Sequence, residues 1–236
     1  TTRMAFHAIK AGEGDVFLSG GVECVSQYGK FAGAGGSDPT DQNPLFHPAI
    51  ARSEEMAKTN SVWTDPREIG MIPDVYLPMG QTAENVATTR GISRQRQDEW
   101  GVASQNRAEA AIASGFFADD ITPVTLPDGT VHATDDGPRP GVTMDGVAGL
   151  KPVFRETGTI TAGNCCPLND GAAAVVVMSD RKAKDLGLTP LARVVATAAT
   201  GLSPEIMGLG PVEASRKALK LAGMTIDDID LYEINE

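Results

Sequence analysis

Two adjacent cysteines, Cys165 and Cys166, are the residues of this sequence best suited to nucleophilic chemistry. A cysteine attacks as its thiolate, which a helix N-terminus or a nearby cation stabilises. Pro167 follows the pair, and then residues 169–171 (Asn-Asp-Gly), which favour a turn that feeds a strand rather than the start of a helix. We therefore interpret the pair as small side chains packed in a substrate loop, and keep a catalytic nucleophile as the alternative.

The other residue types that often act in catalysis have no partner at a useful spacing. His7, His47 and His132 stand apart from one another and from any candidate nucleophile, so we interpret each as structural or exposed. Ser19, in the sequence FLSGG, lacks the leading glycine of a hydrolase nucleophile elbow. These residues predict no complete hydrolase triad.

The glycine-rich stretch 29–38, GKFAGAGGSD, fits neither the dinucleotide-binding pattern nor the P-loop pattern, and we predict a loop there. Asp38, Asp41 and Asn43 offer oxygen atoms to a cation. Pro39 and the lack of the glycine and glutamate of a calcium loop argue against a metal. We expect no metal site in this chain.

Composition narrows the class of protein. The chain has 236 residues, 41% of them hydrophobic, and a formal net charge of −11, which is typical of a soluble globular chain. The negative charge argues against nucleic acid and anionic membranes as partners. The longest apolar run, residues 172–178, is far shorter than the roughly 20 residues of a membrane-spanning helix. Three cysteines without CxxC spacing suggest neither disulfides nor zinc, so we expect a cytoplasmic protein.

The first elements along the chain are a helix and a strand. Apolar residues from Met4 to Ile9 predict a helix that stops at Gly12, and no cap precedes it, so we expect that residue 1 lies inside a longer helix. Residues 16–19 predict a short buried strand. Residues 29–78 are too long and irregular for an ordinary connection, and we expect a small fold of their own or a lid.

Cap and turn residues mark the next elements. Thr82 predicts the start of a helix that ends at Gly91, and Ser93 that of a second helix, which ends at Gly115. The pair 128–129, Asp-Gly, predicts a hairpin.

Strands and helices alternate from residue 159 onward, which favours an α/β layered domain. The apolar stretches predicted as strands are 159–164, 172–179, 191–200 and 230–235. Ser179 and Gly187 bound one predicted helix, and residues 211–222 form another, with Pro at its first turn and Gly223 after its end. The last strand lacks a following helix, so we expect that the chain is also cut at this end.

Several motifs, in this order and spacing, resemble those of thiolases. They are GGVEC at 20–24, MGQTAENVA at 79–87, TAGNCCPLNDGAAAVVVMS at 161–179, IMGLGP at 206–211 and LYEINE at 231–236. Together they cover nearly all of the chain. The resemblance implies the layered αβαβα fold of thiolases, present here incompletely. Residues 1–25 would end the first half, and residues 159–236 would begin the second half. Residues 26–158 would hold the loop domain that covers coenzyme A, with helices returning to the first half.

The resemblance also implies where catalysis takes place. In thiolases a cysteine at a helix N-terminus takes the acyl group, and by this comparison it would precede Thr1. A histidine in a GHP motif and a second cysteine in a CxGGG motif would follow Glu236. Asn235 matches the asparagine that holds a water on the thioester enolate oxygen, and it is the one catalytic residue that the resemblance assigns to this chain.

Residues that contact coenzyme A follow from the same comparison. Arg139 matches an arginine near the nucleotide end, and Met79 a position near the thioester. The positions that line the pantetheine and adenine path are Phe154, Ala162, Cys166 and Met207. Cys166 replaces a serine and Pro167 a glycine of many relatives, and Pro78 stands where biosynthetic relatives often have histidine, which leaves the acyl-chain specificity open.

The function implied is acyl transfer between coenzyme A and a 3-ketoacyl-CoA, by thiolysis or Claisen condensation. The partners would be CoA thioesters and, in the full-length protein, one or three further copies in a homodimer or homotetramer, with no tightly bound cofactor. The chain by itself is expected to be inactive. A ketoacyl-synthase-like condensing enzyme and a non-catalytic CoA-binding protein are the two alternatives.

Overall fold

The computed structural model describes residues 1–27 and 42–235, so the predicted loop 29–38 and the oxygen atoms of Asp38 and Asp41 lie outside the described residues. The chain forms two compact units. The first unit comprises residues 1–41, 168–202 and 209–236, and the second comprises 42–167 and 203–208. Each unit is therefore built from segments that are distant in the sequence.

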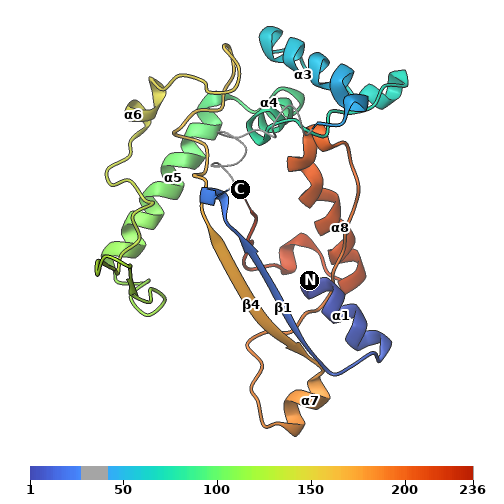
Figure 1. Cartoon of the computed structure of the whole chain (residues 1–236), viewed down its shortest axis with the longest axis vertical. Helices are drawn as coiled ribbons and strands as arrows, with labels where there is room; N and C mark the ends of the chain where they lie inside the picture. Colours follow the sequence, from blue (N-terminus) through green and yellow to red (C-terminus); the bar gives the residue numbers. More distant parts are fainter. Residues whose placement is uncertain (28–41, 236) are drawn as a thin grey trace. The chain divides into compact units, whose positions relative to one another are not determined.

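The first unit contains an antiparallel pair of strands with a helix against it (Figure 1). Its elements are α1 (Thr2–Ala11), β1 (Val16–Glu23), β4 (Gly171–Met178), α7 (Asp180–Asp185), α8 (Gly210–Ala222) and the short 3₁₀ helix η5 (Ile226–Asp228). The register pairs Val16 with Met178 and Glu23 with Gly171. The predicted strands at 16–19 and 172–179 are thus confirmed, and β1 extends through the two glycines after Ser19.

Helix α1 and strand β1 are tied together by hydroxyl groups. Ser19 is buried, and its hydroxyl donates to Thr1 Oγ1 at 2.9 Å and lies 2.8 Å from Thr2 Oγ1. The helix ends as predicted at Gly12, whose φ of 78° suits glycine because it has no Cβ. Ser19 therefore has a structural role here.

Three of the predicted strands are wrong. No strand forms at 159–164, 191–200 or 230–235 within the described part of the chain. At 159–164, Glu84 of helix α4 (Met79–Arg90) accepts the backbone N–H groups of Thr159 and Ile160, and Asn164 bonds back to Thr161 and Thr159. At 191–200 and 230–235 the apolar composition is that of a buried strand, but Leu191 and Leu231 are exposed and no strand pairs with these segments in the described chain.

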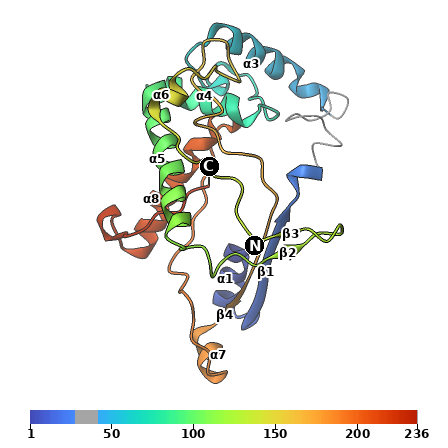
Figure 2. The same ribbon diagram turned by 90° about the vertical axis from the view of Figure 1, so that its left-hand side faces the viewer.

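The second unit is mainly helical, with one small hairpin (Figure 2). Its elements are η2 (Pro44–Phe46), α3 (His47–Thr59), η3 (Pro66–Ile69), α4 (Met79–Arg90), α5 (Arg94–Ala113), β2 (Val124–Thr125), β3 (Val131–His132), α6 (Met144–Ala148) and most of the 3₁₀ segment η4 (Pro204–Leu209). Helix α6 packs against α5. The predicted hairpin is confirmed, with Gly129 at a φ of 87°.

The start of α4 differs from the prediction. Its N-cap is Pro78, four residues before the predicted cap Thr82. The Thr82 hydroxyl instead donates to the Met79 carbonyl at 2.7 Å. A threonine hydroxyl can bond within a helix turn as well as at its start, so sequence alone gives both options. The predicted end at Gly91 and the predicted cap by Ser93 on α5 are confirmed.

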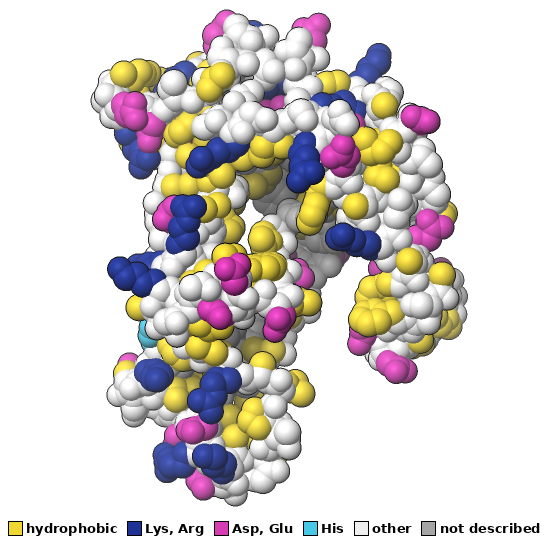
Figure 3. All heavy atoms as spheres, turned by 180° about the vertical axis from the view of Figure 1, so that it is seen from behind, with side chains coloured by type: hydrophobic (Ala, Val, Ile, Leu, Met, Phe, Trp, Pro, Cys, Tyr) yellow, Lys and Arg dark blue, Asp and Glu magenta, His cyan; other side chains and the backbone are white. Residues whose placement is uncertain are grey.

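Many apolar side chains lie at the surface. Leu18 and Val22 on β1, and Val175 and Val176 on β4, are more than half exposed, and Figure 3 shows hydrophobic side chains spread over the face it presents. Surfaces of this kind are typical of regions that contact another protein segment. Among the described residues no helix is both long enough and apolar enough to span a membrane.

Candidate functional site

Helix α4 carries a row of polar side chains on its inner face. Glu84 is fully buried and Asn85 is 2% exposed, and Gln81 lies one turn earlier on the same side. Buried polar groups of this kind require hydrogen-bond partners. The partners come from three other segments, which this row brings together.

Glu84 fixes the segment that leads into the 161–166 loop. Its Oε1 accepts the backbone N–H groups of Thr159 and Ile160, both at 2.8 Å, and its Oε2 accepts the Thr159 hydroxyl at 3.0 Å. The approach requires glycine at position 158, since a Cβ there would overlap the Glu84 carboxylate. The carboxylate thus supplies acceptors that a strand would otherwise provide.

Gln81 and Asn85 hold Arg155. The Arg155 guanidinium donates to Gln81 Oε1 at 2.8 Å, to Asn85 Oδ1 at 2.6 Å and to Asn60 Oδ1 at 3.2 Å. Burial of this guanidinium lowers the pKa of Arg155, and Glu84 opposes the shift. Neutral amide oxygens therefore satisfy most of a buried cation.

The neighbouring residue, Phe154, lies against the first turn of α4. Gln81 Nε2 donates to the Phe154 carbonyl at 2.6 Å, and the Phe154 ring occupies the space where a Cβ of Gly80 would be. Met79, next to Gly80, is 59% exposed. The structure therefore brings Met79 and Phe154, two of the predicted ligand-binding residues, to the same end of α4.

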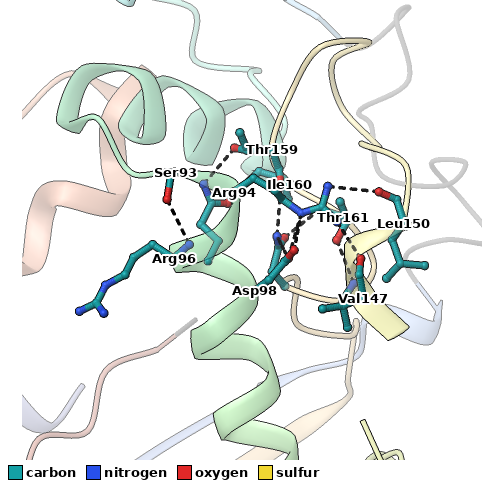
Figure 4. Close-up of polar contacts among 12 residues, drawn as sticks. Ser93, Arg94, Arg96, Asp98, Val147, Leu150, Thr159, Ile160 and Thr161 are labelled. Carbon is teal, nitrogen blue, oxygen red and sulfur yellow. Dashed lines mark hydrogen bonds and ion pairs between the residues drawn. The ribbon is translucent and has the colours of Figure 1, made fainter. Parts of the chain in front are cut away.

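The 161–166 loop is fixed to α5, as Figure 4 shows. Asn164 Nδ2 donates to Asp98 Oδ1 at 2.9 Å and to the Thr159 carbonyl at 3.0 Å, and Asn164 Oδ1 accepts the Thr161 N–H at 2.8 Å. Arg94 pairs with Asp98 and donates to the carbonyls of Val147 and Leu150. Ala162 and Cys166 are exposed on this loop.

Close packing brings the loop onto α5. A Cβ on Gly101 would overlap the carbonyl oxygen of Gly163, and a Cβ on Gly163 would meet Leu150 and Val147. Glycine is needed at both positions for close approach rather than for a turn. The loop thereby presents Ala162 in a fixed place.

The thiol of Cys165 is not activated in this setting. Burial raises the pKa of the Cys165 thiol, and the neighbouring Cys166 adds to the shift. A raised pKa disfavours the thiolate, the reactive form. This disfavours Cys165 as the nucleophile, although both cysteines are exposed on the loop rather than packed within it.

A third segment reaches α4 through Glu205, which is 2% exposed. Asn85 Nδ2 donates to the Glu205 backbone carbonyl at 2.9 Å. A Cβ placed on Gly208 would lie 3.7 Å from Val86 Cγ2, within van der Waals contact. Met207, between them in sequence, is 44% exposed.

The remaining predicted residues are Arg139 and Asn235. Arg139 is exposed, and its backbone N–H donates to Gln105 Oε1 on α5 at 2.8 Å. It belongs to the second unit, like Met79, Phe154, Ala162, Cys166 and Met207. Asn235 belongs to the first unit and is exposed.

An open cavity of about 570 Å³ borders the other side of the 161–166 loop. It is lined by Ile92, Arg96, Gln97, Glu99, Trp100, Ala103 and Asn164. None of the six predicted ligand-binding residues lines this cavity, so its size does not make it the binding site. Within residues 1–27 and 42–235, no three His, Cys, Asp or Glu side chains are grouped as metal ligands.

Glu84, Arg155 and Glu205 were not predicted from the sequence. One sequence signal pointed to Glu84. Gln81, Glu84 and Asn85 recur at helical spacing, so their side chains share one face of α4. The small residues Thr82 and Ala87 on the same helix are buried. Arg155 and Glu205 gave no such signal because their partners are distant in sequence.

Two family models match the chain. The model for the N-terminal domain of thiolase matches residues 2–181, and that for the C-terminal domain matches residues 188–236. Among curated relatives, an acetyl-CoA acetyltransferase from Cupriavidus necator is 44% identical over 99% of this chain and 56% of its own length. A 3-oxoadipyl-CoA/3-oxo-5,6-dehydrosuberyl-CoA thiolase from Escherichia coli is 41% identical over 98% of this chain and 56% of its own length.

Solved structures give the same result for the fold. The dimeric peroxisomal thiolase of Saccharomyces cerevisiae has a TM-score of 0.78 at 35% identity, over 98% of this chain and 53% of its own. Human mitochondrial 3-ketoacyl-CoA thiolase has a TM-score of 0.73 at 34% identity, over 98% of this chain and 55% of its own. The chain spans about half the length of these relatives, and the predicted thiolase-type α/β fold is confirmed. Because both family models and all of these relatives agree along the chain, the chain belongs to the thiolase family.

Proposed function

We propose that the polypeptide containing this chain transfers acyl groups between coenzyme A and a 3-ketoacyl-CoA. In the thiolysis direction, the bond between C2 and C3 of the 3-ketoacyl group breaks, C3 becomes bonded to the sulfur of coenzyme A and C2 takes up a proton, giving acetyl-CoA and an acyl-CoA shorter by two carbons. Relatives named as acetyl-CoA acetyltransferase and as thiolase, each over a third identical, support this proposal. The match to both thiolase models favours it over a ketoacyl synthase.

The observation that carries the proposal is the polar row of α4. Gln81 bonds to Phe154, Glu84 bonds to Ile160 and Asn85 bonds to Glu205. Each of these three segments contains or directly precedes a predicted ligand-binding residue. Burying polar side chains costs free energy unless they are hydrogen-bonded. Here their hydrogen bonds hold three loops in fixed positions, which a binding site requires.

The roles follow residue by residue. Phe154, Ala162, Cys166 and Met207 contact the pantetheine and adenine parts of coenzyme A, Met79 contacts the thioester, and Arg139 supplies a positive charge for the phosphates of the nucleotide. A local cation is needed because the chain carries a net charge of −11. Asn235 holds the water that stabilises the enolate oxygen.

The proposal extends to the setting of the enzyme. Coenzyme A is a substrate, without a tightly bound cofactor. The protein acts in the cytoplasm as a homodimer or homotetramer.

A thiolysis assay tests the proposal. The polypeptide containing residues 1–236 is mixed with coenzyme A and acetoacetyl-CoA or 3-oxoadipyl-CoA, and loss of the 3-ketoacyl-CoA is followed by its enolate absorbance. We expect turnover with at least one of the two, and residues 1–236 alone to be inactive. If 3-ketoacyl-CoA substrates of several chain lengths all remain intact, the proposed function is wrong.

A further inference from the structure

The 203–208 segment is the one short stretch that leaves the first unit and joins the second. The residues before it, 168–202, and after it, 209–236, belong to the first unit. Hydrogen bonds of Glu205 attach this segment to other parts of the second unit. Its buried members include Ser203 and Glu205.

Glu205 receives three donors from three different parts of the second unit. Its Oε1 accepts Arg52 Nη2 from α3 at 2.7 Å and the backbone N–H of Asp74 at 2.7 Å. Its Oε2 accepts the Trp63 indole N–H at 2.6 Å. Both carboxylate oxygens are therefore occupied, one by a cation and both by N–H groups, which is the arrangement that compensates a buried charge.

The backbone of Glu205 is held as well. Its carbonyl accepts Asn85 Nδ2 from α4, and the same Asn85 amide accepts Arg155 through its oxygen. Arg155 adjoins Phe154 in sequence. Asn85 therefore couples the Met207 segment to the Phe154 segment through one side-chain amide.

The chain changes direction directly after Glu205. Ile206 has a φ of −132° and a ψ of 32°, which interrupts the 3₁₀ helix η4, and Met207 follows with 44% of its surface exposed. A methionine side chain has three rotatable bonds, so its own packing does not define where it points. Its position depends on the backbone that carries it.

We infer that Glu205 is a positioning residue for substrate binding: its carboxylate clamps the 203–208 segment to Arg52, Trp63 and Asp74, and so sets Met207 against the acyl-CoA. This inference rests on the proposed function. The Arg52, Trp63 and Asp74 donors act on the carboxylate of Glu205. Their effect reaches the acyl-CoA through Glu205 and the backbone.

Kinetics of the polypeptide containing residues 1–236 test the inference. In Glu205→Ala we expect the KM for the CoA thioester to rise about tenfold, the scale of losing one apolar substrate contact, while kcat per active site stays within about twofold. Glu205→Gln keeps the side-chain length and one acceptor oxygen, so its KM should lie between that of the unsubstituted enzyme and that of Glu205→Ala. Asp65→Ala, which also removes an arginine-paired carboxylate of the second unit, should leave KM unchanged.

A double-mutant cycle separates positioning from stability. Met207→Ala alone should raise KM, and adding Glu205→Ala to it should raise KM no further, because both changes remove the same contact. A purely structural Glu205 would lower the melting temperature and the fraction of active enzyme with an unchanged KM, and this result overturns the inference. If Glu205→Ala does not fold, Glu205→Gln with native KM overturns it equally. If the unsubstituted enzyme shows no thiolysis, the proposed function fails first and the inference with it.

Discussion

The carboxylate of Glu84 accepts the backbone N–H of Ile160 at 2.8 Å, across 76 positions in the sequence. The same oxygen accepts the N–H of Thr159. One side chain on a helix therefore satisfies two consecutive backbone donors, which in a strand would point to opposite sides. The segment 159–164 is a loop for this reason; it contains Ala162 and leads to Cys166.

Glu84→Ala should destabilise the second unit by about 3 kcal/mol or more, because two buried backbone N–H groups and the Thr159 hydroxyl lose their acceptor. Denaturant unfolding followed by tryptophan fluorescence measures this. Both tryptophans of the chain, Trp63 and Trp100, lie in the second unit, so the signal reports on that unit. Glu54→Ala, at an exposed position of α3, is the control and should have little effect. Equal midpoints for the two variants would contradict the role of Glu84.

Gly80→Ala should displace the Phe154 ring, because the added methyl group would occupy its place. Overpacking of this kind costs about 1–3 kcal/mol, more than the gain in helix propensity. Combining it with Phe154→Leu should restore part of the loss. The matched control is Gly149→Ala, where a Cβ meets nothing within 4 Å and φ is −81°. The free energies of unfolding of these three variants decide; an unaltered value for Gly80→Ala would exclude the contact.

Asn164→Asp should weaken the attachment of the 161–166 loop. It replaces the donor that faces Asp98 at 2.9 Å by a carboxylate oxygen, so two negative charges meet where a hydrogen bond was. We expect a loss of about 2 kcal/mol or more at neutral pH that shrinks as the pH falls, because a proton shared between the two carboxyls restores a donor.

Asn43→Asp is the comparison for that variant. Asn43 Oδ1 accepts the N–H of Leu45, and a carboxylate can do the same, so its stability should not change with the substitution. Thermal melts of both variants between pH 5 and pH 8 distinguish them. A pH-independent loss in Asn164→Asp would show that charge repulsion is not its cause.

Asp170 should stabilise one end of the β1–β4 pair in a pH-dependent way. It accepts the Ser26 hydroxyl at 2.6 Å and the Ser26 N–H at 2.8 Å, and these bonds hold the pKa of Asp170 below its ordinary value. A carboxyl whose pKa is lower in the folded state contributes stability above its unfolded value of about 3.9, and that contribution is lost as the pH falls through the folded value.

Carboxyl NMR titration checks this prediction. The Asp170 signal should titrate below the ordinary aspartate range, and in Ser26→Ala it should move toward that range because the hydroxyl bond is lost while the backbone N–H bond remains. Asp170→Asn should lower the melting temperature near neutral pH and lose the difference under acidic conditions. An Asp170 titration with an ordinary midpoint would refute the clamp between Ser26 and Asp170.

Local signals in the sequence predicted much of the secondary structure. Gly12 and Gly91 end their helices, Ser93 caps α5, and the Asp-Gly pair at 128–129 forms a hairpin turn. In each case the residues that decide the structure lie within one or two turns of one another. The thiolase resemblance, which rests on motif order, predicted the fold as well.

Contacts between distant residues were not predictable in this way. Glu84 and Glu205 are carboxylates on helical segments, a pattern that usually indicates a solvent-exposed face, and only the folded chain gives them buried donors. The apolar stretch 191–200 shows the opposite limit. Its composition suits a strand, but a strand also needs a neighbour, which a single segment does not encode.

The entry of 203–208 into the second unit affects how the protein is made. Arg52 and Glu205 are 153 positions apart in the sequence. At a translation rate of about 5–20 residues per second, the ribosome therefore adds Glu205 roughly 8–30 s after Arg52. Until Glu205 is made, the Arg52 guanidinium and the Trp63 indole lack this acceptor. Strand β4 ends at Met178, before Glu205, so the β1–β4 pair can form while this part of the second unit is still incomplete.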